Sequence, residues 1–259
     1  SGMTREDVVV ALGGGVVGDL AGFCAATYQR GVRYVQVPTT LVAQVDSAYG
    51  GKTGVDLAEA KNYVGAYHQP RAVIADIDTL ATLPPAELAA GYAEVVKTAL
   101  IAGGELWEGV RAGADPTAPD VITACVRTKL RIVAQDERDA GLRQVLNLGH
   151  TVGHAIEATT GYARYRHGEA VGLGLLAALR LSGLDDLRAE VADLLSARGL
   201  PVTLEHAAVE EVVVATARDK KRLGEAPVPF VLLDAPGAPR AGCPVDARDL
   251  LAAVRELIA

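Results

Sequence analysis

Three histidines within one eighteen-residue segment are the strongest chemical signal in this chain of 259 residues, which has five histidines in all. His150 and His154 lie four residues apart in the segment LGHTVGH, so on a helix they share one face, which is the spacing of many zinc ligands. His167 follows in the segment RYRHGEA and is expected to begin the next helix. The three residues predict a metal-binding or proton-transferring site, whereas the isolated His68 and His206 are expected to be structural.

A carboxylate commonly completes the protein ligands of a catalytic metal site and leaves one position open. Glu94, in the segment GYAEVVK, is the best candidate. It lies inside an otherwise apolar helical turn, where an unpaired carboxylate would be costly. Lys97 lies three residues further on, on the same helical face. An ordinary surface ion pair between Glu94 and Lys97 is therefore the alternative explanation.

A glycine-rich turn, GGGVVGD at residues 13–19, directly follows a strand-like run and opens a helix. Glycines at such a turn let the backbone approach a pyrophosphate, whose charge the helix N-terminus stabilises. The turn is not a Walker A loop, because no Gly-Lys-Ser/Thr follows. Gly13, Gly15 and Gly18 fit GxGxxG, but the usual acidic residue about twenty positions further on is lacking. The turn therefore predicts either a dinucleotide site or a tight strand-to-helix connection.

Lysine is scarce in this chain, because arginine supplies 19 of the 25 basic residues. This usage favours lysine at positions that need a compact, movable ammonium, although compositional bias would give the same count. Asp46 and Lys52 bracket the segment DSAYGGK, which could place an ammonium beside a bound phosphate or form an ordinary turn. A late run at residues 219–222, DKKR, is typical of a solvated face. The six lysines are Lys52, Lys61, Lys97, Lys129, Lys220 and Lys221.

Strand-like and helix-like segments divide the chain into two parts. Apolar runs at residues 7–12, 34–37 and 72–77, with a helix-like stretch at 17–26, follow the order of an open α/β sheet. From residue 85 apolar residues recur at helical spacing, in segments 88–102, 121–135, 150–158, 168–181 and 187–198, before a short strand-like run at 229–233. We therefore expect a Rossmann-like α/β domain over residues 1–84 and an all-α domain over residues 85–259. Only about three strands are legible before residue 85, so the α/β domain is expected to be the incomplete remainder of a longer protein.

The composition is that of a globular protein, with half of the residues hydrophobic and 22% charged. No apolar run reaches the roughly 18 residues that a membrane span needs, and no signal peptide opens the chain, which predicts a cytoplasmic protein. The three cysteines lack CxxC spacing and are expected to be unpaired thiols. A net charge of −7 argues against a nucleic-acid surface but allows a locally positive pocket for a small anion.

Together these segments resemble the 3-dehydroquinate synthase family. The resemblance runs from about Arg5 to Leu233 and is carried by ALGGGVVGDLAGF, RGV, VPTTLVAQVDS, GGKTGV, KNYVGAYHQP, GYAEVVK, DERDAGLRQVLNLGHTVGHA and HGEAVGLG. It implies an NAD-binding α/β domain followed by a helical domain, usually paired as a homodimer. It also implies conversion of a phosphorylated sugar acid, 3-deoxy-D-arabino-heptulosonate 7-phosphate, to 3-dehydroquinate and phosphate in the shikimate pathway. That reaction proceeds by transient oxidation with NAD, elimination of phosphate, re-reduction and aldol cyclisation.

The resemblance also implies roles for individual residues. The metal, zinc or cobalt, would be bound by Glu94, His150 and His167. NAD would be bound by Gly14, Gly15, Val16, Val17, Gly18, Asp19, Thr39, Thr40, Lys52, Lys61, Asn62, Thr79, Leu80, Ala81 and Thr82. The substrate would contact Asp46, Lys97, Lys129, Arg143, Asn147 and His154, with Lys220 or Lys221 added, and His154 would relay protons rather than bind the metal. Arg30 would reach the substrate phosphate of the neighbouring subunit.

Several features leave alternatives open. The family's opening strands and an acidic NAD-contacting segment would be expected before Ser1, and Tyr49, Asp56 and Ala60 depart from the usual family residues. The alternatives within enzymes are a cyclase acting on sedoheptulose 7-phosphate or an amino analogue, and a polyol or glycerol phosphate dehydrogenase of the same superfamily. From a different class, the chain could be an inactive fragment that serves as a dimerisation module.

Overall fold

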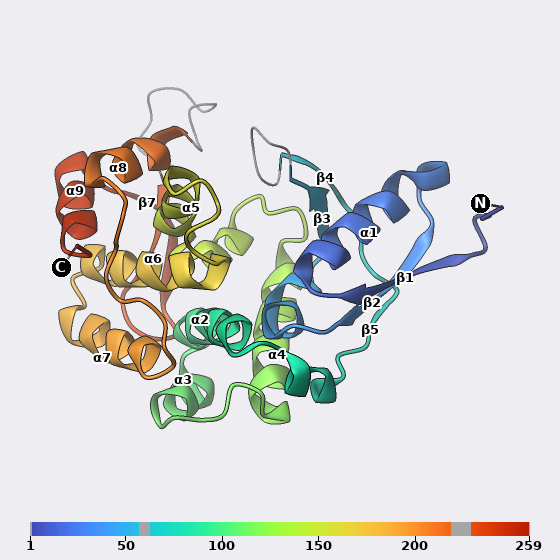
Figure 1. The fold of residues 1–259 in the computed structure, drawn as a ribbon, viewed down its shortest axis with the longest axis horizontal. Helices are drawn as coiled ribbons and strands as arrows, with labels where there is room; N and C mark the ends of the chain where they lie inside the picture. The colour runs from blue at the N-terminus through green and yellow to red at the C-terminus, as the bar shows by residue number, and fades with distance from the viewer. Residues whose placement is uncertain (1, 57–62, 219–228, 259) are drawn as a thin grey trace.

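The computed structural model describes residues 2–56, 63–218 and 229–258, and shows a small α/β part beside a larger helical part (Figure 1). The α/β part opens with β1 (Val8–Gly13), α1 (Gly15–Thr27), a 3₁₀ turn η1 (Tyr28–Arg30) and β2 (Arg33–Pro38). With the short β5 (Ala72–Val73), these strands form a parallel sheet in the order β1-β2-β5. The expected parallel α/β arrangement is therefore confirmed. The run predicted as a strand at residues 72–77 pairs only at its first two residues.

Helix α1 packs closely on the sheet because small residues face its neighbours. Gly18 and Gly22 are buried and lie four residues apart on one side of α1. A side chain at Gly18 would collide with Gln36 of β2, and one at Gly22 would meet Thr53 and Tyr34. The spacing of glycines that suggested a nucleotide turn therefore also serves helix packing.

Segments between β2 and the helical part form irregular elements that the sequence analysis did not predict. A π-helical turn, η2 (Ala43–Ser47), follows the strand β2, and an antiparallel hairpin pairs β3 (Lys52–Val55) with β4 (Val64–Tyr67). A 3₁₀ segment, η3 (Ile77–Thr82), leads into the helices. His68, next to β4, stacks on Tyr34 and bonds to the Val32 carbonyl oxygen at 2.8 Å, which is a structural role, as expected.

The helical part is built around two buried helices. Its elements are α2 (Pro85–Ala102), α3 (Gly104–Arg111), α4 (Pro119–Gln135), η4 (Leu142–Asn147), α5 (His150–Thr159), α6 (His167–Leu181), α7 (Asp185–Ser196), α8 (Val209–Arg218), β6 (Pro229–Leu233), β7 (Pro239–Pro244) and α9 (Ala247–Arg255). Residues 90–101 of α2 are buried on every face, as are most residues of α6. Helices buried all round have no polar stripe, which explains their Ala-, Val- and Leu-rich sequences.

Glycines in α6 bring three site-bearing helices together. A side chain at Gly168 would collide with the backbone of Ala90 in α2, and one at Gly174 with the backbone of Gly149 at the start of α5. These close approaches hold α2, α5 and α6 side by side (Figure 1). The HGEAVGLG segment is therefore a packing motif as well as the source of His167.

The helices and the late strand predicted from the sequence are confirmed to within a few residues. The part after residue 85 is nevertheless not entirely helical, because β7 pairs with β6 in an antiparallel hairpin that covers α6. The sequence analysis missed β7, whose terminal prolines hide a strand pattern, and it also missed the three helices α3, α8 and α9. The free thiols are Cys24, Cys125 and Cys243, as predicted.

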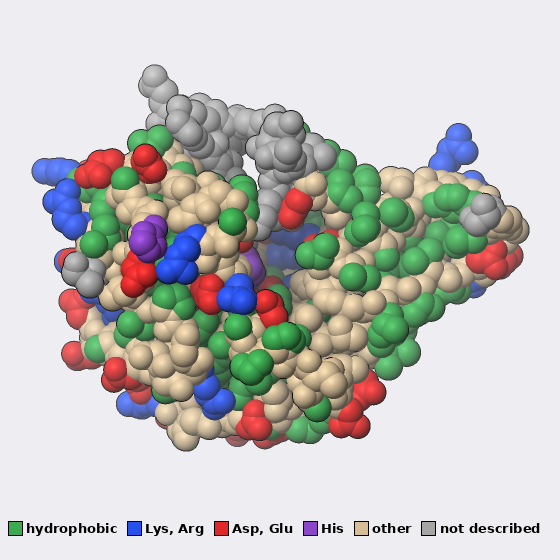
Figure 2. Space-filling view, in the orientation of Figure 1, with side chains coloured by type: hydrophobic (Ala, Val, Ile, Leu, Met, Phe, Trp, Pro, Cys, Tyr) green, Lys and Arg blue, Asp and Glu red, His purple; other side chains and the backbone are tan. Residues whose placement is uncertain are grey.

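The α/β part carries an apolar surface along β1 and the start of α1. β1 is an edge strand, and its residues Val10 and Leu12 are mainly exposed, as is Val16 of α1 at 82%. Figure 2 shows hydrophobic side chains spread over this side of the molecule. A surface of this kind suits contact with further polypeptide. Within the described ranges, no helix combines the length and hydrophobicity that crossing a bilayer requires.

Candidate active site

Three helices bring together the three residues predicted to bind a metal. Glu94 lies in α2, His150 is the first residue of α5 and His167 is the first residue of α6. The Oε1 atom of Glu94 lies 3.6 Å from Nε2 of His150 and 3.3 Å from Nε2 of His167. Their ligand atoms all lie within 4.8 Å of one another. This arrangement of one carboxylate and two imidazoles could hold a divalent metal with a position left open.

Glu94 is a fully buried carboxylate whose surroundings fit a bound cation. Its exposure is 0%, and among the described residues no donor meets either oxygen with good hydrogen-bond geometry. Its Oε2 atom forms an ion pair of 2.5 Å with Nζ of Lys97, whose side chain is 1% exposed. The pair that was the alternative explanation therefore exists, but it is buried rather than at the surface. A buried carboxylate with incomplete hydrogen bonding and two imidazoles beside it is a suitable metal ligand.

Burial and neighbouring charges shift the pKa values of His150 and His167 in opposite directions. Burial alone would raise the pKa of Glu94, but Lys97 and the two histidines hold it well below its usual range. Burial, together with the Lys97 ammonium, lowers the pKa of His150 to about 3. Burial would also lower the pKa of His167, yet the carboxylates of Glu157 and Glu94 on either side of the ring raise it to about 10. A metal ion would therefore find His150 neutral and would displace a proton from His167.

A second cluster continues from Lys97 toward the α/β part. Asp46, from η2, lies 3.6 Å from Nζ of Lys97 and 2.5 Å from Nζ of Lys129, which comes from α4. Nζ of Lys129 also donates to the Asp46 carbonyl oxygen at 2.7 Å. Burial would raise the pKa of Asp46, but the two ammoniums lower it to about 2. The structure thus joins four predicted residues, Asp46, Glu94, Lys97 and Lys129, into one charged group.

Further predicted residues line the same region. Arg143 is buried, and it donates to the Glu137 carbonyl oxygen at 2.6 Å. Burial lowers the pKa of the Lys129 ammonium, and the Asp46 carboxylate opposes that shift. The positive charge of Arg143 is close enough to lower this pKa further. Asn147 is half-buried at the end of η4. The ring of His154 lies 5.3 Å from that of His150 and 6.0 Å from that of His167. Figure 2 shows charged and histidine side chains in a hollow between the two parts of the molecule.

The glycine turn faces this cluster from the α/β side. Gly14 caps α1, and a side chain there would lie 2.9 Å from Thr40; one at Gly15 would lie 2.9 Å from Oγ of Ser47. The Ser47 hydroxyl is buried, and among the described residues it has no hydrogen-bond partner. A side-chain-free helix N-terminus next to a polar atom without a partner fits a bound pyrophosphate. Val16 and Val17 continue α1 on its exposed side.

A buried glutamine links this turn to the other predicted NAD-binding segments. Nε2 of Gln44 donates to the carbonyl oxygens of Pro38 and Asp76, and to Oγ1 of Thr79 at 3.2 Å. Thr39 donates its backbone N–H to the carbonyl oxygen of Gly13 at 2.9 Å. The end of β2, the glycine turn and η3 therefore lie together at the carboxyl ends of the parallel strands, where ligands of open α/β sheets bind. The segment η3 contains the predicted residues Leu80, Ala81 and Thr82.

Residues 1–90 match the family model described as 3-dehydroquinate synthase N-terminal, and residues 91–222 match the one described as 3-dehydroquinate synthase C-terminal. The chain belongs to the 3-dehydroquinate synthase family. It is 48% identical over 242 residues to the 3-dehydroquinate synthase of Caulobacter vibrioides, covering 86% of this chain and 65% of that protein. It is 43% identical over 267 residues to that of Leptospira interrogans, covering 98% and 73%.

Solved structures of related cyclases show the same architecture as this family member. A 2-deoxy-scyllo-inosose synthase in complex with carbaglucose-6-phosphate, NAD+ and Co2+ superimposes with a TM-score of 0.88 at 29% identity, over 98% of this chain and 75% of that chain. A 2-epi-5-epi-valiolone synthase from Streptomyces hygroscopicus, with NAD+ and Zn2+ bound, gives a TM-score of 0.89 at 28% identity, over 99% and 74%. The dehydroquinate synthase-like fold is thereby confirmed.

Some residues predicted from the family motifs are not brought into the cluster. Lys52 is exposed on β3 and forms an ion pair with Asp139. Arg30 is exposed at the end of η1, the 3₁₀ turn that follows α1. Lys61, Asn62, Lys220 and Lys221 lie outside the described residues. For all of these the assigned roles stay predictions.

Three residues near the site were not predicted from the sequence, namely Gln44, Ser47 and Glu157. Of the three, Glu157 was the easiest to predict from the sequence, since it lies three residues after His154 and seven after His150 in an otherwise apolar helix. A carboxylate on the histidine face of a buried helix is itself a signal. Gln44 and Ser47 carry no comparable pattern, because their roles depend on how η2 packs against distant segments.

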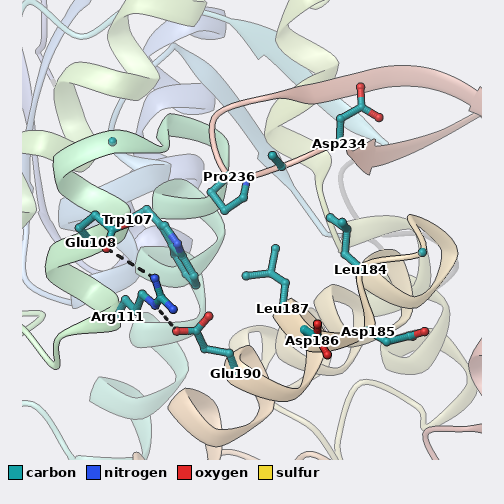
Figure 3. A pocket seen from close by; sticks show the side chains of 13 residues that line it. Trp107, Glu108, Arg111, Leu184, Asp185, Asp186, Leu187, Glu190, Asp234 and Pro236 are labelled. Carbon is teal, nitrogen blue, oxygen red and sulfur yellow. Dashed lines mark hydrogen bonds and ion pairs between the residues drawn. The ribbon is translucent and has the colours of Figure 1, made fainter.

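A surface pocket elsewhere in this family member is not the candidate site. It has a volume of about 540 Å³ and lies between α3, α7 and the turn that joins β6 to β7 (Figure 3). Its Arg111 pairs with Glu190 at 2.5 Å and with Glu108 at 3.7 Å. None of the described residues predicted to act lines this pocket.

The carboxyl group of Asp19 is expected to make the stability of the protein depend on pH. Asp19 is half-buried in α1, and burial raises its pKa to about 7, against the influence of Lys129 and with that of Asp56 and Asp46. An unfolded aspartate titrates near pH 4. Between about pH 4 and 7 the folded chain therefore keeps a proton that the unfolded chain releases, and the stability from protonated Asp19 is lost as the pH rises through about 7.

We expect Asp19→Asn to melt at nearly the same temperature as the wild type near pH 4 and at a higher temperature above pH 7. The gap should widen between about pH 4 and 7 and then stay constant. Melting curves in a series of buffers measure this. Asp193→Asn, at an exposed position of α7, is the matched control. A gap for Asp19→Asn that is equal at all pH values would contradict the raised pKa.

Proposed function

We propose that the chain performs the reaction of its family, the conversion of 3-deoxy-D-arabino-heptulosonate 7-phosphate to 3-dehydroquinate and phosphate. The observation that carries the proposal is the buried Glu94, faced by two imidazoles on one side and by the Lys97 ammonium on the other. A dimerisation module needs no such charged interior. The family membership supplies the substrate class.

The residues present suit both cofactors that the related cyclases hold. Glu94, His150 and His167 would bind zinc or cobalt, and the turn at Gly14, Gly15 and Gly18, with Thr39, Thr40 and η3, would bind NAD. When bound, the metal polarises a hydroxyl or carbonyl group and NAD accepts and returns a hydride. The protein supplies the orientation of both groups and the exclusion of water.

The cationic cluster explains how a chain of net charge −7 could hold a substrate with a phosphate and a carboxylate. Lys97, Lys129 and Arg143 are buried, and hydrogen bonds from buried cations to phosphate oxygens are strong. Asp46 holds the ammonium groups of Lys97 and Lys129 in place while no substrate is bound. His154 is half-buried beside the metal-binding pair, which suits a residue that moves protons to and from the substrate.

The assembly and location of the protein are part of the same proposal. A homodimer is supported by the apolar surface of β1 and α1 and by the position of Arg30, and light scattering would give the mass in solution. A cytoplasmic location follows from the substrate class and is tested by cell fractionation.

Incubation with the substrate, NAD and zinc tests the reaction. The expected result is stoichiometric release of inorganic phosphate with no net accumulation of NADH, because the hydride is returned within each turnover. A sample treated with a chelator is expected to release none. Net NADH would contradict the cyclase and favour a dehydrogenase. Release only from sedoheptulose 7-phosphate would favour a second candidate, another sugar-phosphate cyclase, which the likeness to the inosose and valiolone synthases supports.

A further inference from the structure

His167 is faced by a carboxylate on each side of its ring. Nε2 lies 3.3 Å from Oε1 of Glu94, and Nδ1 lies 3.3 Å from Oε2 of Glu157. Glu157 comes from α5 and is 2% exposed. An imidazole that binds a metal through one nitrogen keeps its hydrogen on the other. Which carboxylate receives that hydrogen determines where the metal lies.

The orientation of His150 indicates which side the metal occupies. Its Nδ1 lies 3.2 Å from the carbonyl oxygen of Leu148, which can only accept, so Nδ1 carries the hydrogen. Nε2 is then the nitrogen of His150 that is left to bind a metal, and it lies 3.6 Å from Oε1 of Glu94. Among the described residues, His150 belongs to the ligand set of Glu94 and not to that of Glu157. The geometry of His150 therefore favours a metal on the Glu94 side.

A second set of side chains could bind a metal on the other side of His167. Atoms of His154, Glu157 and His167 also lie within 4.8 Å of one another. A metal there would take Nδ1 of His167 and would leave its Nε2–H to Glu94. A metal there would leave the buried Glu94 and Nε2 of His150, which lie 3.6 Å apart, without a shared cation, so the Glu94 side is preferred.

We propose that Glu157 is a positioning residue, which accepts the Nδ1–H of His167 and thereby directs Nε2 of His167 at a metal held with Glu94 and His150. This inference rests on the metal site of the proposed function. A buried carboxylate behind a metal-binding histidine fixes the ring and makes it a better ligand. The Leu148 carbonyl oxygen does the same for His150, so each imidazole is held from behind by one acceptor.

The affinity of the full chain for zinc, measured by competition with a chromophoric chelator, tests the role of Glu157. Glu157→Leu is expected to bind zinc about 10–100-fold more weakly than the wild type. Glu157→Gln is expected to lose less, because its amide oxygen still accepts the hydrogen bond but carries no charge. Glu105→Gln, at an exposed position of α3, is the matched control and is expected to bind zinc normally. If Glu157→Leu fails to fold, Glu157→Gln still decides the question.

The ring nitrogens report the position of the metal directly. In the zinc-loaded chain with ¹⁵N-labelled histidine, the NMR spectrum should show His167 bound through Nε2 with hydrogen on Nδ1. Metal bound through Nδ1, or wild-type zinc affinity in both Glu157 variants, would overturn the positioning role while leaving the proposed function intact. A wild-type chain that binds no zinc or cobalt would overturn the metal site itself and this inference with it.

Discussion

Replacing Glu94 with glutamine is expected to abolish tight zinc binding and to stop turnover. Glutamine keeps the size of the side chain but removes the charge that two imidazoles and an ammonium surround. The loss should exceed the roughly 10–100-fold in affinity that removal of a residue supporting a metal ligand costs, because a ligand itself is removed. Zinc content after gel filtration and the rate of phosphate release measure the two effects.

The control for this prediction separates the site from the general fold. Glu105→Gln changes the same residue type at an exposed position of the neighbouring helix α3 and should retain both zinc and activity. Circular dichroism establishes whether Glu94→Gln keeps its helices. A Glu94→Gln protein that holds one zinc per chain at wild-type affinity would show that the metal lies elsewhere.

The sequence was sufficient to predict that His150, His154 and His167 form one site, because their signal is local; the choice of His150 and His167 as metal ligands came from the family resemblance and stays a prediction. His150 and His154 share a helical face whatever the rest of the fold does, and His167 begins the next helix. The choice of Glu94 depended on burial, which an apolar helical turn suggests but does not determine. The structure decided between a buried residue and a surface ion pair by placing α2 at the centre of the helical part.

Long-range contacts limited the rest of the prediction. Lys129 and Asp46 are 83 residues apart in the chain, and no periodicity indicates that η2 and α4 meet. The family resemblance supplied both residues, but not the ion pairs that join them to Lys97 and Glu94. For Lys52, a local pattern suggested a contact that the structure does not show. The Gly-Gly turn suggested a phosphate contact, and the structure pairs this lysine with Asp139.

Removal of the Lys97 ammonium is expected to destabilise the metal-free protein severely. Lys97→Met leaves the buried Glu94 without its ammonium partner, whereas Asp46 keeps its ion pair with Lys129. Breaking a buried ion pair by removing one partner costs about 3–5 kcal/mol in the free energy of unfolding. Urea unfolding in the presence of a chelator measures this loss. The double variant Lys97→Met with Glu94→Gln should be more stable than Lys97→Met alone, because the buried carboxylate that lost its partner is then also removed.

Zinc should reverse much of this loss, because the metal and the ammonium neutralise the same carboxylate. A ligand that binds only the folded chain stabilises it by an amount that grows with its concentration above its dissociation constant. Lys129→Met is the matched control, since Lys129 pairs with Asp46 and not with Glu94. Zinc should therefore raise the unfolding midpoint of Lys97→Met more than that of Lys129→Met. Equal increases in the two variants would mean that Lys97 and the metal do not share Glu94, and that the buried ion pair is independent of the metal site.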